Sequence, residues 1–493
     1  MGALHRGRWM VALVVGLLAP FLVPEPASPA PAVAPRCGKQ DLPETGVAGD
    51  VPLADQLSGR ADQGYNCGLA VVGHSPLDNR GGNANMAWSG DCAYIAGDGV
   101  AVVDVRDPAH PRLVRTLHGP GSDATIETIN AVDAPGRSLL VTGRYGLFGH
   151  QSLGGEGPVE VWDVRDCLHP KHLSTFNFPY NVHNLTLTAD GKRLWSTLPL
   201  QAADLTDLRH PKVLPDIESQ VAAGGAFHLQ YAHEVWPSPD GKRIYFGGQE
   251  AVDEGLVVLD VEGWPKRPAR VVSQISHPGH SIRPMTIDGK PYLIASDESI
   301  LNPTAKGCLP NALTPFGGAS RPSLIDISHE KQPKVRSVLS VAINEPLHCV
   351  DQVLSGVNAS VHYQDVDNQD DTTFAMVSSW NAGLRIFDVR DPVHPREVAY
   401  FNPGRWGLEL DQAWAHIRYR QDTGQIWLTT ASGGFWVLEL EPQLRAALGL
   451  SKMTAVHPDG AVPRPASSQR VVATPIRLVQ PSTYCALSTA RIL

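Results

Sequence analysis

Apolar and polar residues alternate in short runs along most of the chain, which is the pattern of half-buried β-strands. The runs are rich in β-branched and aromatic residues, as strands are. Tight-turn dipeptides separate several of them, namely Asp190-Gly191, Asp240-Gly241 and Asp288-Gly289. Asp-Gly between two apolar runs is typical of a β-hairpin. The pattern therefore predicts an all-β protein.

A longer unit also recurs, in which an apolar run ends in an acid and a proline-containing turn follows. Clear copies are VVDVRDPAHP at 102–111, VWDVRDCLHP at 161–170 and IFDVRDPVHP at 386–395. Seven acids share the aligned position, at intervals of 41 to 66 residues: Asp104, Asp163, Asp204, Asp260, Asp326, Asp388 and Glu439. These intervals suit one four-stranded blade per unit, so we expect a seven-bladed β-propeller over residues 65–442. The acids are expected to accept turn N–H groups rather than to catalyse a reaction.

These units resemble the LVIVD repeat family of bacterial secreted β-propeller proteins. The lead-in Gly73-His74-Ser75-Pro76-Leu77 supports the resemblance, which covers roughly residues 65–442. The resemblance implies the propeller fold and export, but it names no activity, because propellers host many functions.

The two ends of the chain differ from its repetitive centre. A basic start, an apolar run from Trp9 to Val23 and the small residues Ala32-Val33-Ala34 predict a signal peptide over residues 1–34. Residues 35–64 are interpreted as a linker and 443–493 as a mostly irregular tail with a short helix from Gln443 to Leu450. We therefore expect a secreted, extracytoplasmic protein with no stable membrane span after cleavage; a retained N-terminal anchor is the alternative.

Charge and cysteine content indicate which partners and which covalent links to expect. A net charge of −9 with interspersed signs argues against a nucleic-acid partner. Seven cysteines follow the predicted cleavage site, so an exported protein would hold disulfides and at least one cysteine without a partner in the chain. The pairs Cys67–Cys92 and Cys308–Cys349 are predicted because each brackets a loop-rich segment.

Five histidines occupy a similar place near the start of the predicted innermost strands: His183, His233, His280, His362 and His416. In the first two units, Asn85 and Asn130 are predicted to take the histidine's place. We expect all these side chains near one mouth of the central channel. Loops that end the second strands should emerge there with Glu250, Asp297, Glu298, Trp380 and Asn381.

Two functions from different classes fit this mouth. The first is a binding or interaction protein that recruits an unknown protein, glycan or small-molecule ligand, and the sequence favours it because no motif names a reaction. The second is a metal-dependent oxidoreductase or hydrolase, in which the histidines hold copper, iron or zinc and Glu250 or Glu298 acts as acid or base. In architecture and histidine placement alone, the chain is similar to carotenoid oxygenases and to the selenium-binding or methanethiol oxidase group. A purely structural role for the histidines is the third possibility.

The other repeated histidines have a simpler interpretation. His110, His169, His210 and His394 lie in the proline-containing turns, on the outer part of each predicted blade. Capping of the turn explains their recurrence without a ligand.

Overall fold

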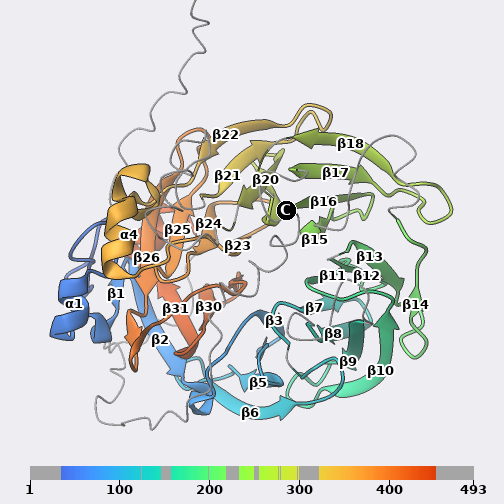
Figure 1. Ribbon diagram of the computed structural model, residues 1–493, viewed down its shortest axis with the longest axis horizontal. Helices are drawn as coiled ribbons and strands as arrows, with labels where there is room; N and C mark the ends of the chain where they lie inside the picture. Colours follow the sequence, from blue (N-terminus) through green and yellow to red (C-terminus); the bar gives the residue numbers. More distant parts are fainter. Residues whose placement is uncertain are drawn as a thin grey trace, which may run out of the picture.

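The protein is an all-β, seven-bladed propeller, as the sequence predicted. Figure 1 shows seven sheets arranged in a ring around a central axis. The computed structural model describes residues 35–123, 125–145, 157–197, 199–217, 232–248, 255–275, 277, 279–296, 298 and 321–450. The predicted signal peptide and tail residues 451–493 lie outside these ranges.

Each blade is a four-stranded antiparallel sheet whose first strand is nearest the axis. Blade one contains β3 (Met86–Ser89), β4 (Cys92–Ile95), β5 (Val100–Asp104) and β6 (Arg112–Leu117). Blade two contains β7 (Ile129–Ala134), β8 (Arg137–Gly143), β9 (Gly157–Asp163) and β10 (Lys171–Phe178). Blade three contains β11 (Leu185–Leu187), β12 (Arg193–Ser196), β13 (Gln201–Asp204) and β14 (Lys212–Val213). Blade four contains β15 (Ala232–Pro237), β16 (Arg243–Gly248), β17 (Leu256–Asp260) and β18 (Arg270–Ile275).

The remaining blades follow the same plan. Blade five contains β19 (Ser281–Ile287), β20 (Lys290–Ser296), β21 (Ser323–Asp326) and β22 (Lys334–Val338). Blade six contains β23 (Gln364–Val366), β24 (Phe374–Ser378), β25 (Leu384–Asp388) and β26 (Arg396–Asn402). Blade seven contains β29 (Arg418–Tyr419), β30 (Gln425–Thr430) and β31 (Gly434–Leu440).

The N-terminal part of the chain closes the ring. Strand β2 (Leu69–Ser75) pairs with β31 and so becomes the outermost strand of blade seven. Strand β1 (Tyr65–Cys67) pairs with β26 and adds a fifth strand to blade six. Because β2 covers the edge of β31, the first and last described parts of the propeller are held in one sheet.

Short helices and one hairpin lie outside the blades. They are α1 (Leu53–Ser58), η1 (Arg60–Gln63), η2 (Leu77–Asn79), η5 (Ala342–Asn344), η6 (Pro346–His348), α4 (Cys349–Ser355), α5 (Pro442–Ala447) and the pair β27 (Arg405–Trp406) and β28 (Glu409–Leu410). Residues 35–64, predicted as a linker, pack on the propeller, since Val51 and Ala61 are buried in the core between blades five and six. Helix α5 overlaps the helical stretch predicted for the start of the tail. Within the described ranges, no helix has the length and apolar character needed to cross a membrane.

Apolar side chains fill the wedges between neighbouring blades. Between blades seven and one, Trp427 and Phe435 pack with Met86, Ala93 and Ala101, and all five side chains are buried. Strand alternation explains this arrangement, because every second residue of a blade faces the next blade.

The repeated acids end the third strands and hold the turns that follow, as predicted. Asp104 accepts a hydrogen bond from the Arg106 backbone N–H at 3.1 Å and from the Arg106 and Arg112 guanidinium groups. The turn histidines are exposed, and each lies beside the aspartate three residues earlier, as His110 does beside Asp107 at 2.9 Å. The contacts support the structural interpretation of both repeated residues.

One of these acids makes stability sensitive to acid. Burial alone would raise the pKa of Asp326, but the Arg336 guanidinium and the Ser328 N–H lower it to about 2. A lowered folded-state pKa stabilises the protein above the unfolded value near 4, and this contribution disappears as pH falls through the folded pKa. We expect Asp326→Asn to lower the unfolding free energy at pH 7 by about 1 kcal/mol or less, given solvent screening. Urea unfolding between pH 7 and pH 2 should show the difference shrinking below pH 4. A constant difference over that range would contradict the assignment, and Asp98→Asn at an exposed turn is the control.

Two disulfides link the described residues, and one predicted pairing is wrong. Cys37 bonds to Cys67, and Cys92 bonds to Cys167, so Cys67 and Cys92 are not partners. The reason is that β1 joins blade six, which is separated from blade one by blade seven, whereas Cys167 lies in blade two beside Cys92. Cys308 lies outside the described residues, so its pairing with Cys349 stays a prediction.

Candidate functional site

The strand register identifies one equivalent position on the inner side of every blade. It is found in three steps: from each aligned acid to its partner on the second strand, then four residues further along that strand, and then across to the facing residue next to the axis. One residue before that inner-strand residue is the cluster position, occupied in blades one to seven by Ala84, Glu127, His183, His233, His280, His362 and Ala415. The inner-strand residues themselves form what we call the middle layer: Asn85, Thr128, Asn184, Glu234, Ser281, Tyr363 and His416. Four histidines and one glutamate from five consecutive blades therefore share the cluster position.

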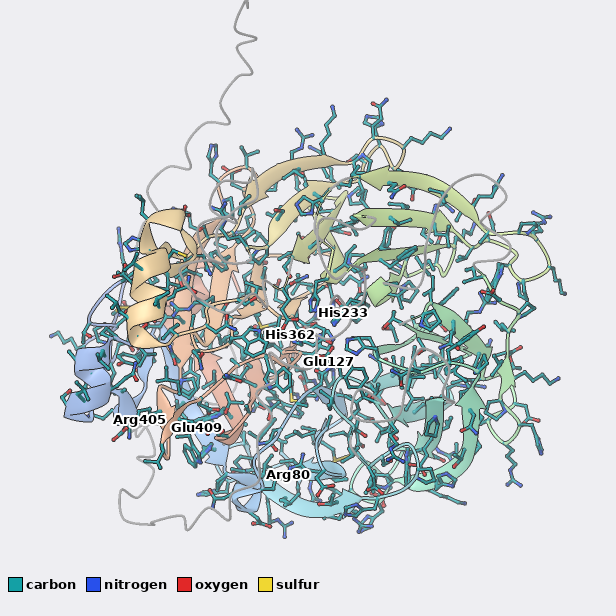
Figure 2. The ribbon with its side chains drawn as sticks, in the orientation of Figure 1. Arg80, Glu127, His233, His362, Arg405 and Glu409 are labelled. Atoms are coloured by element: carbon teal, nitrogen blue, oxygen red, sulfur yellow. A yellow bond between two sulfur atoms is a disulfide. The ribbon has the colours of Figure 1, made fainter. Side chains whose placement is uncertain are left out.

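These five side chains converge near the axis of the ring. Figure 2 shows Glu127, His233 and His362 close to its centre. The Glu127 carboxylate lies 3.0 Å from His183 Nε2, 3.3 Å from His233 Nε2 and 3.4 Å from His362 Nε2. The Nε2 atoms of His183 and His233 are 2.6 Å apart. His183, His233 and His280 are fully buried, and His362 is 1% exposed.

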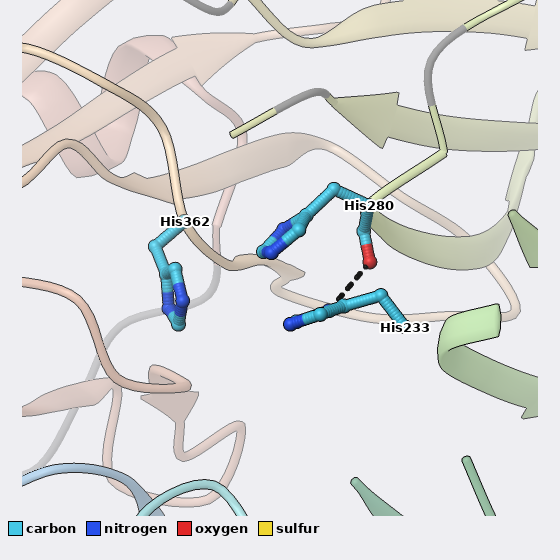
Figure 3. Close-up of side chains that lie close together, drawn as sticks. All are labelled: His233, His280 and His362. Carbon is cyan, nitrogen blue, oxygen red and sulfur yellow. Dashed lines mark hydrogen bonds between the residues drawn. The ribbon is translucent and has the colours of Figure 1, made fainter. Parts of the chain in front are cut away.

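A second carboxylate completes the cluster. Glu298, in the loop after β20, lies 3.0 Å from His280 Nε2 and 3.5 Å from His362 Nε2. Neither contact is an aligned hydrogen bond, and the two Nε2 atoms make none within the described part of the chain. Figure 3 shows the His233, His280 and His362 rings turned toward a common space.

Backbone carbonyl groups orient two of the imidazoles. His233 Nδ1 lies 2.9 Å from the His280 carbonyl oxygen, and His362 Nδ1 lies 2.6 Å from the Trp414 carbonyl oxygen. A carbonyl can only accept, so each Nδ1 carries the proton and Nε2 keeps its lone pair in the neutral ring. This tautomer directs a ligand nitrogen toward the cluster.

The charges of the cluster are unequal. Burial lowers the pKa of His233, and burial with the neighbouring His233 and His362 rings lowers that of His280 well below its usual value. Burial also disfavours charged His362, but the Glu298 and Glu127 carboxylates outweigh it and raise the pKa of His362 to about 9. Burial acts against ionised Glu127 as well, yet the His183 and His362 imidazoles hold the pKa of Glu127 well below its usual range. The Glu127 and Glu298 carboxylates thus favour a positive charge on His362, whereas burial favours the neutral forms of His233 and His280.

This donor set can hold a metal ion. His233, His280 and His362 form one candidate group and Glu127, His183 and His233 another, each with its ligand atoms within 4.8 Å of one another. Bonds to such an ion are about 2.0–2.2 Å long. The Nε2 atoms of His183 and His233, which are 2.6 Å apart, would therefore have to separate if both bound one ion. Imidazole and carboxylate donors suit first-row transition metals such as iron, copper or zinc.

The structure separates His416 from the other four histidines predicted with it. His416 belongs to the middle layer, where its Nε2 lies 3.2 Å from Glu234 and its Nδ1 lies 3.1 Å from Asp365. Its ring stacks on Tyr363 at a centroid distance of 4.0 Å. It belongs to neither candidate metal group.

The other predicted mouth residues have different surroundings. Asn85 accepts the His416 N–H, and Asn130 accepts the Leu187 N–H in the next blade. Trp380 is buried edge-on to His362 at 5.9 Å, and Asn381 donates to backbone carbonyl groups of the loop before blade seven. Glu250 and Asp297 lie outside the described residues, whereas Glu298 lies in the cluster.

Glu127 is the site residue that sequence reasoning missed. Asn130 was predicted to replace the histidine in blade two, but the register places Glu127 there, three residues earlier. The sequence did hold a signal for Glu127. Counting back from the acid Asp163 through the hairpin at Pro135-Gly136 locates the inner strand of blade two, and Glu127 lies just before that strand.

A family model confirms the repeat seen in the sequence. The LVIVD repeat model matches residues 81–118, which span blade one. The chain contains an LVIVD repeat. The search of curated proteins found no match for this chain.

Solved structures resemble this chain in fold alone. The β-propeller domain of Cps50 (Swd1) from Myceliophteria thermophila is 13% identical, with a TM-score of 0.48 over 73% of this chain and 98% of that one. An ancestral GH74 enzyme is 10% identical, with a TM-score of 0.50 over 76% of this chain and 49% of that one. A functionally unknown protein from Desulfotomaculum acetoxidans is 11% identical, with a TM-score of 0.42 over 66% and 87%. At such identities, no activity can be transferred to this chain.

Proposed function

We propose that this LVIVD-repeat protein is an exported, metal-dependent enzyme, an oxidoreductase or hydrolase. A transition-metal ion would be held by His183, His233, His280 and His362, with Glu127 and Glu298 balancing its charge. The observation that carries the proposal is the burial of four imidazoles from four consecutive blades around two carboxylates. When bound, such an ion supplies Lewis acidity or a redox couple.

The alternative use of a buried imidazole cluster is weaker on physical grounds. Unpaired polar groups in the interior cost free energy, and two Nε2 atoms here have no aligned hydrogen bond within the described chain. A bound cation would accept the lone pair of His280 Nε2 and would take the place of the proton that charged His362 carries on Nε2. A metal-free binding mouth gains less support, because mouth residues should be accessible to a partner and these histidines are buried.

Export is part of the proposal. The two disulfides are compatible with an oxidising, extracytoplasmic location. Secretion itself depends on the predicted signal peptide, so N-terminal sequencing of the protein recovered from the medium should find a start near Pro35.

Metal content tests the proposal. Protein purified from its export compartment without a histidine tag should carry close to one transition-metal ion per chain by elemental mass spectrometry. The double change His233→Ala and His280→Ala removes two ligand nitrogens and should reduce this at least tenfold, with the circular dichroism spectrum retained. His394→Ala changes an exposed turn histidine, so it should leave the metal in place.

Two results would end the metal proposal. One is wild-type protein that is isolated without metal and takes up no added iron, copper or zinc. The other is equal metal content in the double variant and the wild type. Either would return the function to a binding role for the propeller.

A further inference from the structure

A second candidate site lies at the other end of the channel from the histidine cluster. A cavity of about 380 Å³ opens where the inner strands run into their hairpins, and residues from all seven blades line it. We infer that this cavity binds a small molecule with an aromatic or apolar body and a carboxylate group. Its volume lies in the lower part of the range of small-molecule sites.

The walls of the cavity combine apolar and polar side chains, the latter including Asn130, Gln369 and Asp370. Trp88 of blade one and Trp236 of blade four contribute indole rings, and Met86, Leu187 and Pro237 add aliphatic surface. Both tryptophans are only partly buried, so their rings present surface to the cavity. Aromatic walls favour a planar or ring-bearing ligand, because ring contacts add about 0.5–1.5 kcal/mol to area burial.

Arg283 provides the charged anchor. Its side chain is 15% exposed, and its Nη1 lies 2.5 Å from the Asp365 carboxylate. The guanidinium carbon lies 4.0 Å from the centre of the Trp236 ring. Its buried Nε has no hydrogen-bond partner in the described part of the protein. A guanidinium group held in place with donors to spare matches the geometry of a carboxylate.

Two buried acids, Glu234 and Asp365, hold this anchor in place, whereas the acid that lines the cavity, Asp370, is exposed to solvent. Glu234 accepts from Trp236 Nε1 at 2.7 Å and from the Ile282 N–H at 2.7 Å, and it also contacts His416. Asp365 accepts from the Ile417 N–H at 2.8 Å and contacts both His416 and Arg283. These carboxylates thus face protein donors, which leaves the remaining Arg283 donors for a ligand oxygen.

The cavity is distinct from the cluster but connected to it. The middle layer lies between them, where the Tyr363 hydroxyl donates to Glu127 and accepts from Asn184 Nδ2, both at 2.9 Å. His416, which also lines the cavity, stacks on Tyr363. Ligand binding in the cavity does not require a metal, so the inference goes beyond the proposed function and can be tested without it.

The test uses the full chain after treatment with a chelator and two matched probes, 4-phenylbutyrate and 4-phenyl-1-butanol. Isothermal titration calorimetry should show one site that binds the carboxylate at least tenfold more tightly than the alcohol. Arg283→Met should weaken 4-phenylbutyrate at least tenfold and leave the alcohol within twofold. Arg336→Met, which removes an exposed guanidinium on the outermost strand of blade five, is the control and should change neither.

A second variant keeps the test decisive if loss of Arg283 impairs folding. Ala131→Phe places a ring in the cavity without touching the ion pairs, so it should abolish binding of both probes. The inference is overturned if neither probe binds the wild type, if both probes bind equally, or if Ala131→Phe binds them as the wild type does. Because metal content is measured separately, failure here leaves the metal proposal untouched.

Discussion

Replacing Arg385 by methionine should lower the free energy of unfolding by about 3–5 kcal/mol. Arg385 is fully buried in β25 and lies between two acids, Glu44 and Glu397, contacting the latter at 3.1 Å. Burial opposes the charge on Arg385, but the Glu44 and Glu397 carboxylates outweigh it and raise the pKa of Arg385. Methionine fills a similar volume but leaves the Glu44 and Glu397 carboxylates buried without a cation. Removing one partner of a buried ion pair destabilises the fold strongly, because the remaining charge is uncompensated.

The effect should also reach the N-terminal segment. Glu44 belongs to that segment, and its backbone N–H donates to Tyr400 on β26 at 3.0 Å. Urea unfolding at pH 7 measures the loss, and limited proteolysis should show earlier cleavage near residue 44. Arg165→Met is the matched control, since Arg165 is 72% exposed and pairs with Asp163 at the surface, where a pair contributes about 0–1 kcal/mol. If Arg385→Met and Arg165→Met lowered the free energy of unfolding equally, the burial of the Arg385 ion pairs would not explain the loss.

Removing the Cys92–Cys167 disulfide should cost about 4 kcal/mol. The bond closes 75 residues of chain, and loop-closure entropy in the unfolded state scales with the logarithm of that length. It also joins β4 of blade one to the turn after β9 of blade two, where the Tyr94 hydroxyl donates to the Cys167 carbonyl at 3.0 Å. The double change Cys92→Ala and Cys167→Ala, followed by urea unfolding, gives the value.

The second disulfide supplies the comparison. Cys37–Cys67 spans 30 residues, so Cys37→Ala with Cys67→Ala should cost less than the longer link. A loss below about 1 kcal/mol for the Cys92–Cys167 variant would contradict this prediction. It would mean that residual contacts between the two segments already restrict the unfolded chain without the disulfide.

The blades were predictable because each carries its own local signals. Strand alternation, Asp-Gly hairpins and the acid before each turn act over a few residues, and the structure has Asp104 and Asp326 where the pattern places them. Ring closure was not predictable, since β2 pairs with β31 from the far end of the chain. The cysteine pairing failed for the same reason, because β1 carries Cys67 into blade six.

The sequence was enough to predict a histidine cluster on the inner strands, but not which residue of each strand belongs to it. Four of the five histidines meet at the axis, but a shift of one residue moves a side chain to another layer of a strand. His416 falls in the middle layer for that reason, and Glu127 enters the cluster. Local sequence around Glu127 has no Asp-Gly turn to set the count. Burial was also missed, because it depends on how all seven inner strands approach one axis.

The most direct test of the metal centre is anomalous diffraction from crystals of the untagged protein, collected above and below the absorption edge of the metal found by elemental analysis. We predict one strong anomalous peak among the Nε2 atoms of His183, His233, His280 and His362, at about 2.0–2.2 Å from the nearest nitrogens. A metal peak elsewhere in the molecule, with the four imidazoles free of metal, would contradict the account.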